Sequence, residues 1–237
     1  MIEFNTIAKN VLSREQQELL PLLEDFSHTH FLIWGTAISL QLGHRKSIDF
    51  DFINNLSQGT LLEFKKRVES HNIYLERAEL ERFAGAENIK QDEFHFTINS
   101  VHFSCFNYYR TLYDDQKIQI YSDLILFWGL KTLSLKQLLC TKLFACITRN
   151  KWKDAVDIYF ILNHLEITLN QALTLCEEKY FINIFNRNYV LEQLVSWNWD
   201  TTESVEYLIK NPPKDEEVIS FLQNQAQELI SKASKNS

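Results

Sequence analysis

Hydrophobic residues recur with two different periods along the chain, and the change falls near Ser134. Before it, short apolar runs and strict alternations such as "SIDFDFI" are typical of β-strands and are interleaved with amphipathic helical segments. After it, each clearly periodic segment repeats at helical spacing, from "SLKQLLCTKLFACITR" to "DEEVISFLQNQAQELISKA". The sequence therefore predicts an α+β fold, with a mixed β-sheet and flanking helices over residues 1–133 and an all-helical half over residues 134–237.

Individual elements of the first half can be placed from local signals. Ser13 followed by Gln16 is a capping-box pattern that starts a helix predicted over 14–26. "HFLIW" is typical of a buried strand that ends at Gly35, and "TAISLQLG" predicts a helix stopped by its final glycine. "QGTLLEFKKRVESH" predicts another helix and "NIYLERAEL" a strand. "DEFHFTIN" and "SVHFSCFNYY" predict an antiparallel pair on either side of Ser100.

Composition favours a folded protein in a reducing compartment. Apolar residues make up 45% of the chain and aromatic residues 13%, while the net charge of −7 does not favour nucleic acid as a partner of the whole molecule. The four cysteines have neither CxxC spacing nor companion histidines, which predicts buried, reduced thiols. Because the chain carries an early acid and no long apolar run, we expect no signal peptide, no membrane span and a cytoplasmic location.

Asp49 and Asp51 lie two residues apart in a stretch in which acidic and apolar residues alternate. On a strand they would share one face, about 6.5–7 Å apart, with Ile48, Phe50 and Phe52 on the other. Burying two unpaired carboxylates would be costly, so we expect them on an open face of the sheet. Two carboxylates so placed can bind Mg²⁺, which takes oxygen ligands and usually completes its shell with water and substrate phosphates.

Gly35 and Thr36 lie where the predicted strand gives way to the predicted helix. Amide groups at a helix N-terminus attract phosphate, and glycine lets a phosphate approach the backbone closely. Thr36 would cap the helix and lend its hydroxyl to a phosphate oxygen. A DxD pair alone, or a Gly-Thr pair alone, is a weak signal. The ordered combination of glycine, hydroxyl and DxD within strand–helix–strand is more specific and predicts a metal–phosphate site.

A second group of charged residues lies in the helical half. Lys142 interrupts the apolar run "LLCTKLFAC" and must reach solvent, a carboxylate or a phosphate. Asp154 and Asp157 are three residues apart and share a helix face. These three residues could form part of a substrate site or a structural network of ion pairs. In the same way, His44 and Arg45 could hold a phosphate or form an exposed turn.

The ordered combination resembles the nucleotidyltransferase superfamily related to DNA polymerase β. More narrowly, "GTAISLQLGHRKSIDFDF" is similar to the AbiEii/AbiGii abortive-infection toxin family, which reads Gly-Gly-Thr-Ala-Leu and then His-Arg-x-Ser-x-Asp-x-Asp. The matching positions are Gly35, Thr36, Ala37, His44, Arg45, Ser47, Asp49 and Asp51. "SLKQLLCTKLFACITRNKWKDAVDIYFIL" resembles the helical motif of that family at Lys142, Arg149, Lys153, Asp154 and Asp157.

This resemblance implies a nucleotidyltransferase fold and Mg²⁺-dependent transfer of a nucleotide from an NTP, with tRNA as acceptor in some members. It also implies a toxin of a toxin–antitoxin or phage-defence pair, with an antitoxin protein as partner. The implied site residues are Asp49 and Asp51 for catalysis and metal, Gly35, Thr36 and Arg45 for nucleotide, and Lys142, Asp154 and Asp157 for catalysis. If tRNA is the acceptor, three basic clusters should share one face and make binding salt-dependent: Arg45-Lys46, Lys65-Lys66-Arg67 and Arg149-Lys151-Lys153.

Two positions depart from the family pattern. Trp34 stands where the first of the two glycines is usual. The third acid that active members of the wider superfamily bring from a later strand is expected near Ser104, which is not a normal Mg²⁺ ligand. Glu93, Asp92 or an aspartate of the helical half could substitute. The alternative is a catalytically degenerate relative that acts as a nucleotide- or protein-binding module.

Overall fold

The computed structural model describes residues 2–54, 68–71, 93–107, 123–127, 129–180, 185–196, 199 and 204–235. The chain divides into two compact units. The first contains Met1–Leu40, Lys46–Lys117 and Leu124–Leu133, and the second contains Gln41–Arg45, Ile118–Asp123 and Ser134–Ser237. The second unit, which is the helical one, therefore includes two short segments from the part of the sequence before Ser134.

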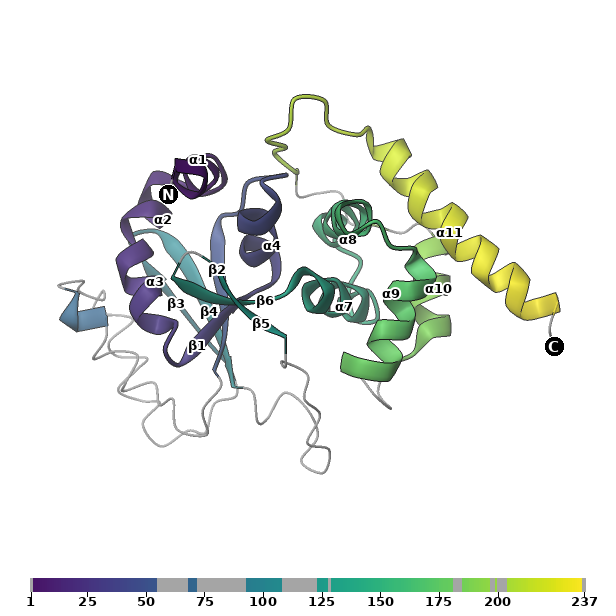
Figure 1. Cartoon of the computed structure of the whole chain (residues 1–237), viewed down its shortest axis with the longest axis horizontal. Coiled ribbons are helices and arrows are strands. Elements are labelled where there is room, and N and C mark those ends of the chain that lie inside the picture. Colours follow the sequence, from purple (N-terminus) through teal and green to yellow (C-terminus); the bar gives the residue numbers. More distant parts are fainter. Residues whose placement is uncertain are drawn as a thin grey trace. The chain divides into compact units, whose positions relative to one another are not determined.

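A six-stranded mixed sheet forms the centre of the first unit, with strand order β3-β4-β2-β1-β6-β5 (Figure 1). The strands are β1 (His30–Ile33), β2 (Asp49–Asn54), β3 (Glu93–Ile98), β4 (Val101–Asn107), β5 (Leu124–Phe127) and β6 (Leu130–Leu133). Strand β2 pairs antiparallel with β1 and parallel with β4, whereas β3 pairs antiparallel with β4. The predicted α+β fold with a mixed sheet is confirmed. Strands β5 and β6 were not predicted, because "LILFWGL" is an apolar run without alternation.

Four helices of the first part of the chain are described: α1 (Ile2–Val11), α2 (Arg14–Glu18), α3 (Leu20–Phe26) and α4 (Trp34–Leu42). The capping box at Ser13 is confirmed, since its hydroxyl and the Gln16 side chain each accept the other residue's backbone N–H. The single helix predicted over 14–26 is instead two helices. Pro21, in the first turn of α3, cannot donate a helical hydrogen bond to an earlier turn, which explains the break.

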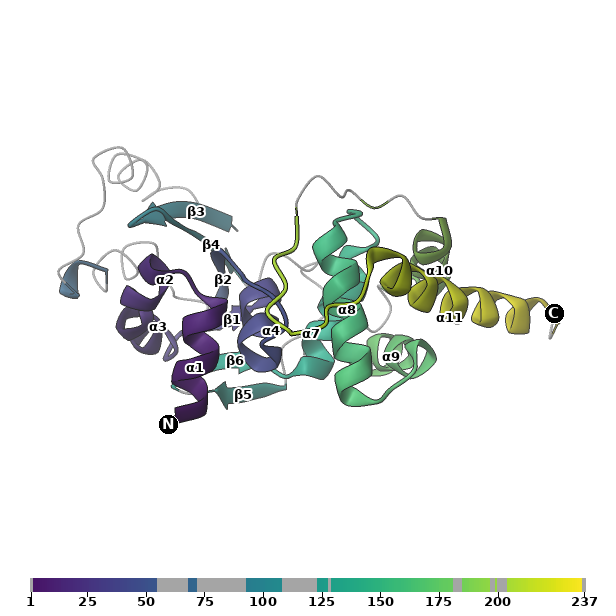
Figure 2. The ribbon, with the colours of Figure 1, turned by 90° about the horizontal axis from the view of Figure 1, so that it is seen from above.

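Phenylalanine rings fill the space between one face of the sheet and α3. The fully buried rings are Phe26, Phe50, Phe52, Phe96 and Phe103. The centroids of Phe50 and Phe103 lie 5.3 Å apart on the neighbouring strands β2 and β4. Phe26 of α3 packs edge-on against Phe52. Burying one such ring stabilises the fold by roughly 1.5–3 kcal/mol. Figure 2 shows α3 and α4 on opposite sides of the strands.

Two predictions for this unit are not confirmed. Ile48, expected to face inward with the phenylalanines, precedes β2 and is 69% exposed, because the alternation begins only at the strand's first residue. Of the helix predicted from "QGTLLEFKKRVESH", only Val68–His71 is described, with Val68–Ser70 helical, and the strand predicted from "NIYLERAEL" lies outside the described residues.

The second unit is helical, as predicted. Its elements are α7 (Leu135–Ala145), α8 (Trp152–Leu165), α9 (Leu169–Leu175) with the π-helical turn Cys176–Tyr180, α10 (Arg187–Ser196) and α11 (Asp215–Lys235). The Ser134 and Thr168 hydroxyls cap α7 and α9 by accepting N–H groups of the first turn. Val218, Leu222 and Ala226 of α11 are buried four residues apart, so one stripe of this long helix faces the core.

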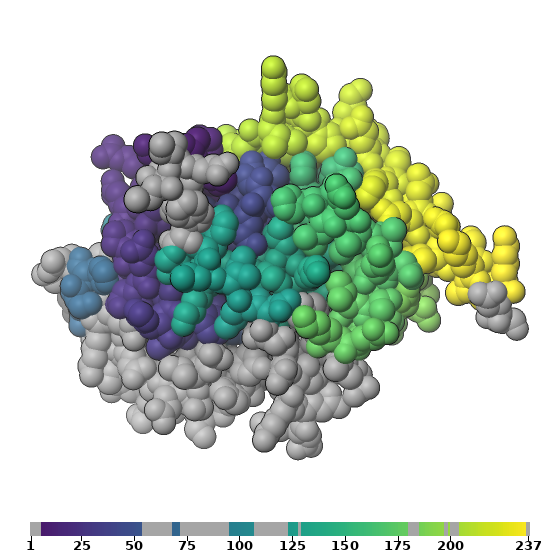
Figure 3. Space-filling view, in the orientation of Figure 1, coloured from purple at the N-terminus to yellow at the C-terminus, as the bar shows by residue number. Residues whose placement is uncertain are grey.

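The edge strand β5 exposes a short apolar surface. Leu124, Ile125 and Leu126 of the edge strand β5 are exposed, and the teal atoms of this region reach the visible face in Figure 3. The four cysteines are buried and unpaired, as predicted. Among the described helices, none combines the length and apolar character needed to cross a membrane.

Candidate functional site

Asp49 and Asp51 share one face of β2, opposite the phenylalanine core. Both carboxylates are partly exposed, whereas the intervening Phe50 is fully buried. In the parallel pairing of β2 with β4, Asp49 lies opposite His102 and Asp51 opposite Ser104. The strand thus presents the two acids together, outside the apolar core, as the alternation predicted.

The first residue of α4 has an uncommon backbone conformation. Trp34 has φ of 57°, in the left-handed region that glycine adopts freely and other residues adopt at a cost of about 1–2 kcal/mol. Its ring packs edge-on against Phe106, with centroids 4.7 Å apart. This is the position at which the resembled motif carries its first glycine. The conformation gives a physical reason for that glycine, and ring packing holds tryptophan in its place.

Thr36 joins the start of α4 to the start of β2. Its side chain is fully buried, and its hydroxyl donates to the backbone carbonyl of Asp49 and lies 2.6 Å from the Ser47 hydroxyl. The predicted cap is wrong, because α4 begins two residues earlier, at Trp34. Gly35 and Thr36 therefore lie in the first turn of the helix. Their contact with a phosphate stays a prediction.

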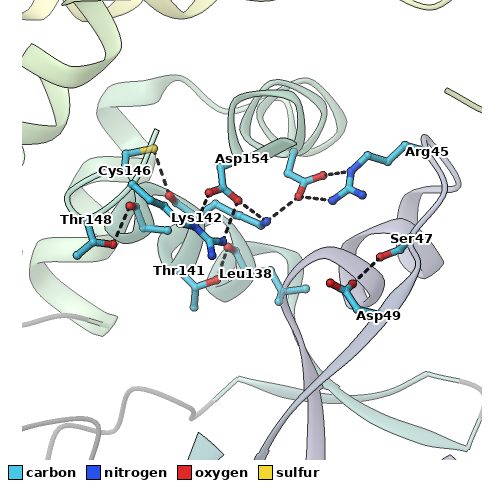
Figure 4. A network of polar contacts seen from close by, with 12 residues as sticks. Arg45, Ser47, Asp49, Leu138, Thr141, Lys142, Cys146, Thr148 and Asp154 are labelled. Carbon is cyan, nitrogen blue, oxygen red and sulfur yellow. Dashed lines mark hydrogen bonds and ion pairs between the residues drawn. The ribbon is translucent and has the colours of Figure 1, made fainter. Parts of the chain in front are cut away.

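Ser47 supports the same junction. Its hydroxyl lies 3.5 Å from Asp49 Oδ1 (Figure 4). In addition to the Thr36 contact, its backbone N–H donates to the carbonyl of Val11. One serine thus connects the N-terminal helix, α4 and the first acid of β2. These contacts place Ser47 where it can orient the Asp49 side chain.

A separate cluster of ionic residues lies inside the helical unit. Arg45 binds Asp157 of α8 through Nε–Oδ1 and Nη2–Oδ2 hydrogen bonds, each 2.8 Å long. His44 Nε2 lies 2.9 Å from the same carboxylate. All three side chains are buried, so Arg45 is not part of an exposed basic face. Its expected contact with a phosphate stays a prediction.

Lys142 of α7 completes this cluster (Figure 4). Its Nζ lies 2.6 Å from Asp154 Oδ1 and 2.9 Å from Asp157 Oδ2. Asp154 also binds Arg149, at 2.8 Å. In the structure, Lys142 therefore forms ion pairs with both Asp154 and Asp157. This arrangement matches the ion-pair network that the sequence left open as an alternative. A catalytic role for them stays a prediction.

The cluster shifts the protonation of its members. Burial alone would raise the pKa of Asp157, but the charges of Arg45 and Lys142 outweigh it and hold that pKa well below its usual range. Burial likewise opposes the charge of Lys142, yet Asp154 and Asp157 raise its pKa above the ordinary value. Burial lowers the pKa of His44 despite its hydrogen bond to Asp157. The cluster therefore holds charged lysine, arginine and carboxylates beside a neutral imidazole.

The donors on β2 suit a magnesium ion better than a metal that needs a complete protein cage. Among the described residues, no group of three or more His, Cys, Asp or Glu side chains is placed to hold a metal. Two carboxylates fit Mg²⁺, which usually takes one or two from the protein and the rest from water and phosphate. Ser104 stands where the third acid was expected; Asp92 and the Glu93 side chain lie outside the described part.

The structure adds His95 and His102, which sequence reasoning missed. They lie on β3 and β4 with their rings stacked, 5.5 Å between centroids, and His95 Nδ1 is 3.1 Å from Ser104 Oγ. The signal in the sequence was the two-residue spacing at Asn99-Ser100 between two alternating runs, and in the structure both residues have the positive φ of a two-residue hairpin turn. Such a turn between the alternations "EFHFTI" and "VHFSCF" places His95 opposite Ser104.

Comparisons with known proteins agree with this architecture. Residues 31–232 match the family model described as the nucleotidyl transferase AbiEii toxin of type IV toxin–antitoxin systems. An uncharacterized protein of Aquifex aeolicus is 27% identical over 221 residues, which cover 92% of this chain and 98% of that protein.

Two solved structures from Helicobacter pylori share the fold. JHP933 is 16% identical, with a TM-score of 0.53 over 95% of this chain and 96% of its own. A proposed nucleotidyltransferase is 17% identical, with a TM-score of 0.52 over 94% of this chain and 96% of its own. At these identities the likeness concerns the fold.

Proposed function

Because the chain belongs to the AbiEii nucleotidyltransferase toxin family, we propose that it transfers a nucleotide from an NTP to an acceptor hydroxyl, with Mg²⁺ bound at Asp49 and Asp51. The observation that carries the proposal is the shared face of these two acids on β2, with the N-terminus of α4 attached to Asp49 through Thr36. This combination supplies oxygen ligands for a cation and backbone amides for phosphate oxygens.

Each part of this region has a definite task in the proposal. Asp49 and Asp51 bind the cation, and Ser47 and Thr36 orient the first of them. The backbone amides of Gly35 and Thr36, in the first turn of α4, bind the triphosphate. Magnesium at such a site neutralises phosphate charge and favours attack by the acceptor hydroxyl.

Arg45 and the helical cluster act by positioning. Arg45 is fixed by Asp157, which is fixed in turn by Lys142, and Ser47 follows Arg45 by only two residues. A rigid Arg45 limits the freedom of the segment that leads into β2. In this proposal Lys142, Asp154 and Asp157 influence transfer through that segment, and their direct contact with a phosphate is a separate, testable possibility.

The proposed acceptor is tRNA and the proposed partner is an antitoxin protein, in keeping with a toxin of a toxin–antitoxin or phage-defence system. Because Arg45 is buried, Lys46 and the Arg149–Lys153 region are the described basic residues proposed to contact RNA phosphates, while the predicted cluster Lys65-Lys66-Arg67 lies outside the described residues. A second candidate function is nucleotide or protein binding without turnover. The observation in its favour is Ser104, opposite Asp51 where an acid was expected.

The test is transfer of label from each of the four α-³²P NTPs to total bacterial tRNA, with and without Mg²⁺. We expect transfer by the wild-type protein from at least one NTP, and loss of transfer in Asp49→Asn and Asp51→Asn. Lys46→Met is the matched control near the same strand and should change salt dependence more than turnover. Mg²⁺-dependent NTP binding in calorimetry without any transfer would support the binding module and overturn the transferase.

A further inference from the structure

Transfer to a hydroxyl requires a group that takes the hydroxyl's proton. On the acid-bearing face of β2, β3 and β4, the described carboxylates and imidazoles are Asp49, Asp51, His95 and His102. A carboxylate that binds a cation shares its lone pairs with the metal and is a weaker proton acceptor. The imidazoles are therefore the better candidates, and this inference rests on the proposed function.

Within the described part of the chain, His95 is the imidazole that contacts a residue beside Asp51. Ser104 lies directly opposite Asp51 on β4, and His95 lies directly opposite Ser104 on β3. The three residues thus form one row across neighbouring strands, which are spaced about 4.8 Å apart. Ser104 Oγ is 3.1 Å from His95 Nδ1, a normal distance for a hydrogen bond.

The difference in burial between Ser104 and His95 gives proton transfer along this row a direction. Ser104 is only 5% exposed, whereas His95 is exposed. A proton that enters at the buried serine can therefore pass to an imidazole that is exposed. His102 stacks on His95 but lies opposite Asp49, so it shares the environment of His95 without its position in the row.

We propose that Ser104 and His95 form a proton relay at the position where the third carboxylate was expected. The acceptor oxygen attacks the α-phosphorus, so that a new P–O bond forms as the bond to pyrophosphate breaks. The acceptor's proton passes to Ser104 Oγ, while the proton of the serine passes to His95 Nδ1. The resulting imidazolium releases a proton to water. The relay requires the tautomer in which Nδ1 carries the lone pair and Nε2 the hydrogen before the step.

The experiment measures kcat and KM for the NTP in the tRNA-labelling assay, with thermal unfolding as a check on folding. His95→Gln and Ser104→Ala should lower kcat by about 10²- to 10⁴-fold, the usual contribution of a general base, with KM nearly unchanged. His102→Gln is the matched control and should stay within about threefold of the wild type. Ser104→Asp places a carboxylate in the row and should remain active.

The decisive comparison is the double variant. In the Ser104→Asp background the carboxylate accepts the proton, so adding His95→Gln should no longer lower kcat. An equal loss in both backgrounds would show that His95 is structural and would overturn the relay, as would inactive Ser104→Asp protein that is folded. If Asp49→Asn abolishes transfer while His95→Gln leaves kcat unchanged, the relay fails and the transferase stands. If the wild type transfers nothing, the proposed function itself fails.

Discussion

Arg45 holds Asp157 through two parallel hydrogen bonds of equal length, 2.8 Å, from Nε and Nη2 to the two carboxylate oxygens. Both side chains are buried, and Lys142 and His44 contact the same carboxylate. This paired geometry is available to arginine and not to lysine. The interaction fixes the segment Gln41–Arg45 on α8 within the helical unit.

Replacing Arg45 should strongly destabilise that unit. Arg45→Met leaves a buried carboxylate with one fewer cation, and breaking a buried pair from one side costs about 3–5 kcal/mol. Urea unfolding followed by circular dichroism measures the loss. Lys46→Met, an exposed neighbour, is the control and should stay within about 0.5 kcal/mol of the wild type. A loss below about 1 kcal/mol for Arg45→Met would mean that the pair contributes little.

Stability should fall on acidification, beginning near the ordinary pKa of histidine. Burial lowers the pKa of His44 in the folded protein. Below the ordinary pKa of histidine, the unfolded chain therefore binds a proton at His44 more readily than the folded chain does. The stability from neutral His44 is present above the unfolded pKa, about 6.5, and is lost as pH falls below it. The lowered pKa of Asp157 adds a second loss at lower pH, below about 4, in the same direction.

His44→Gln separates these two contributions. Glutamine has an amide N–H that can donate to Asp157 and does not titrate. The free energy of unfolding measured between pH 7.5 and 5 should decline less steeply in the variant than in the wild type. Parallel slopes would assign the decline to other groups.

Trp34 should reverse the usual preference for alanine over glycine in a helix. At φ of 57°, Trp34→Ala keeps the strained backbone and loses the ring packing, whereas Trp34→Gly loses the packing and relieves the strain. We expect Trp34→Gly to be more stable than Trp34→Ala by about 1 kcal/mol. Thermal unfolding compares them. At Gln41, in the same helix, the alanine variant should be more stable than the glycine variant by a similar amount.

Thr36 should be required for its hydroxyl group. Thr36→Val removes the donor to the Asp49 carbonyl and the hydroxyl contact with Ser47, at a cost of about 1–3 kcal/mol. Thr36→Ser keeps the oxygen and should retain most stability and nucleotide transfer. Unfolding and tRNA labelling at a temperature where both variants are folded measure the two effects. Equal behaviour of valine and serine would contradict a role for the hydroxyl.

Short-range patterns predicted much of the fold and the acid pair. The alternation around Asp49 and Asp51 fixed their common face, because side chains on a strand alternate strictly. The helices after Ser134 followed from their period, and the cap at Ser13 from local chemistry. The break at Leu19 was missed because apolar periodicity continues through Pro21 even though its backbone cannot donate.

Local sequence patterns could not predict contacts between side chains that lie far apart in the chain. Arg45 and Asp157 are 112 residues apart, and no local pattern says which carboxylate a buried arginine will meet. The sequence therefore left Lys142 and the aspartates of α8 undecided between substrate and scaffold. The His95–Ser104 contact is different, since it depends on a two-residue turn whose register follows from its length.

The assignment of Gln41–Arg45 to the helical unit means that the two units do not correspond to two uninterrupted stretches of the gene. A fragment that starts at Ser134 would contain Asp157 and Lys142 but neither Arg45 nor His44. It would keep the buried Asp157 carboxylate while losing the Arg45 guanidinium that pairs with it. Gene truncation at this point, or exchange of the helical half between relatives, would therefore have to carry this five-residue segment along. In evolutionary terms, the two halves are bound to change together.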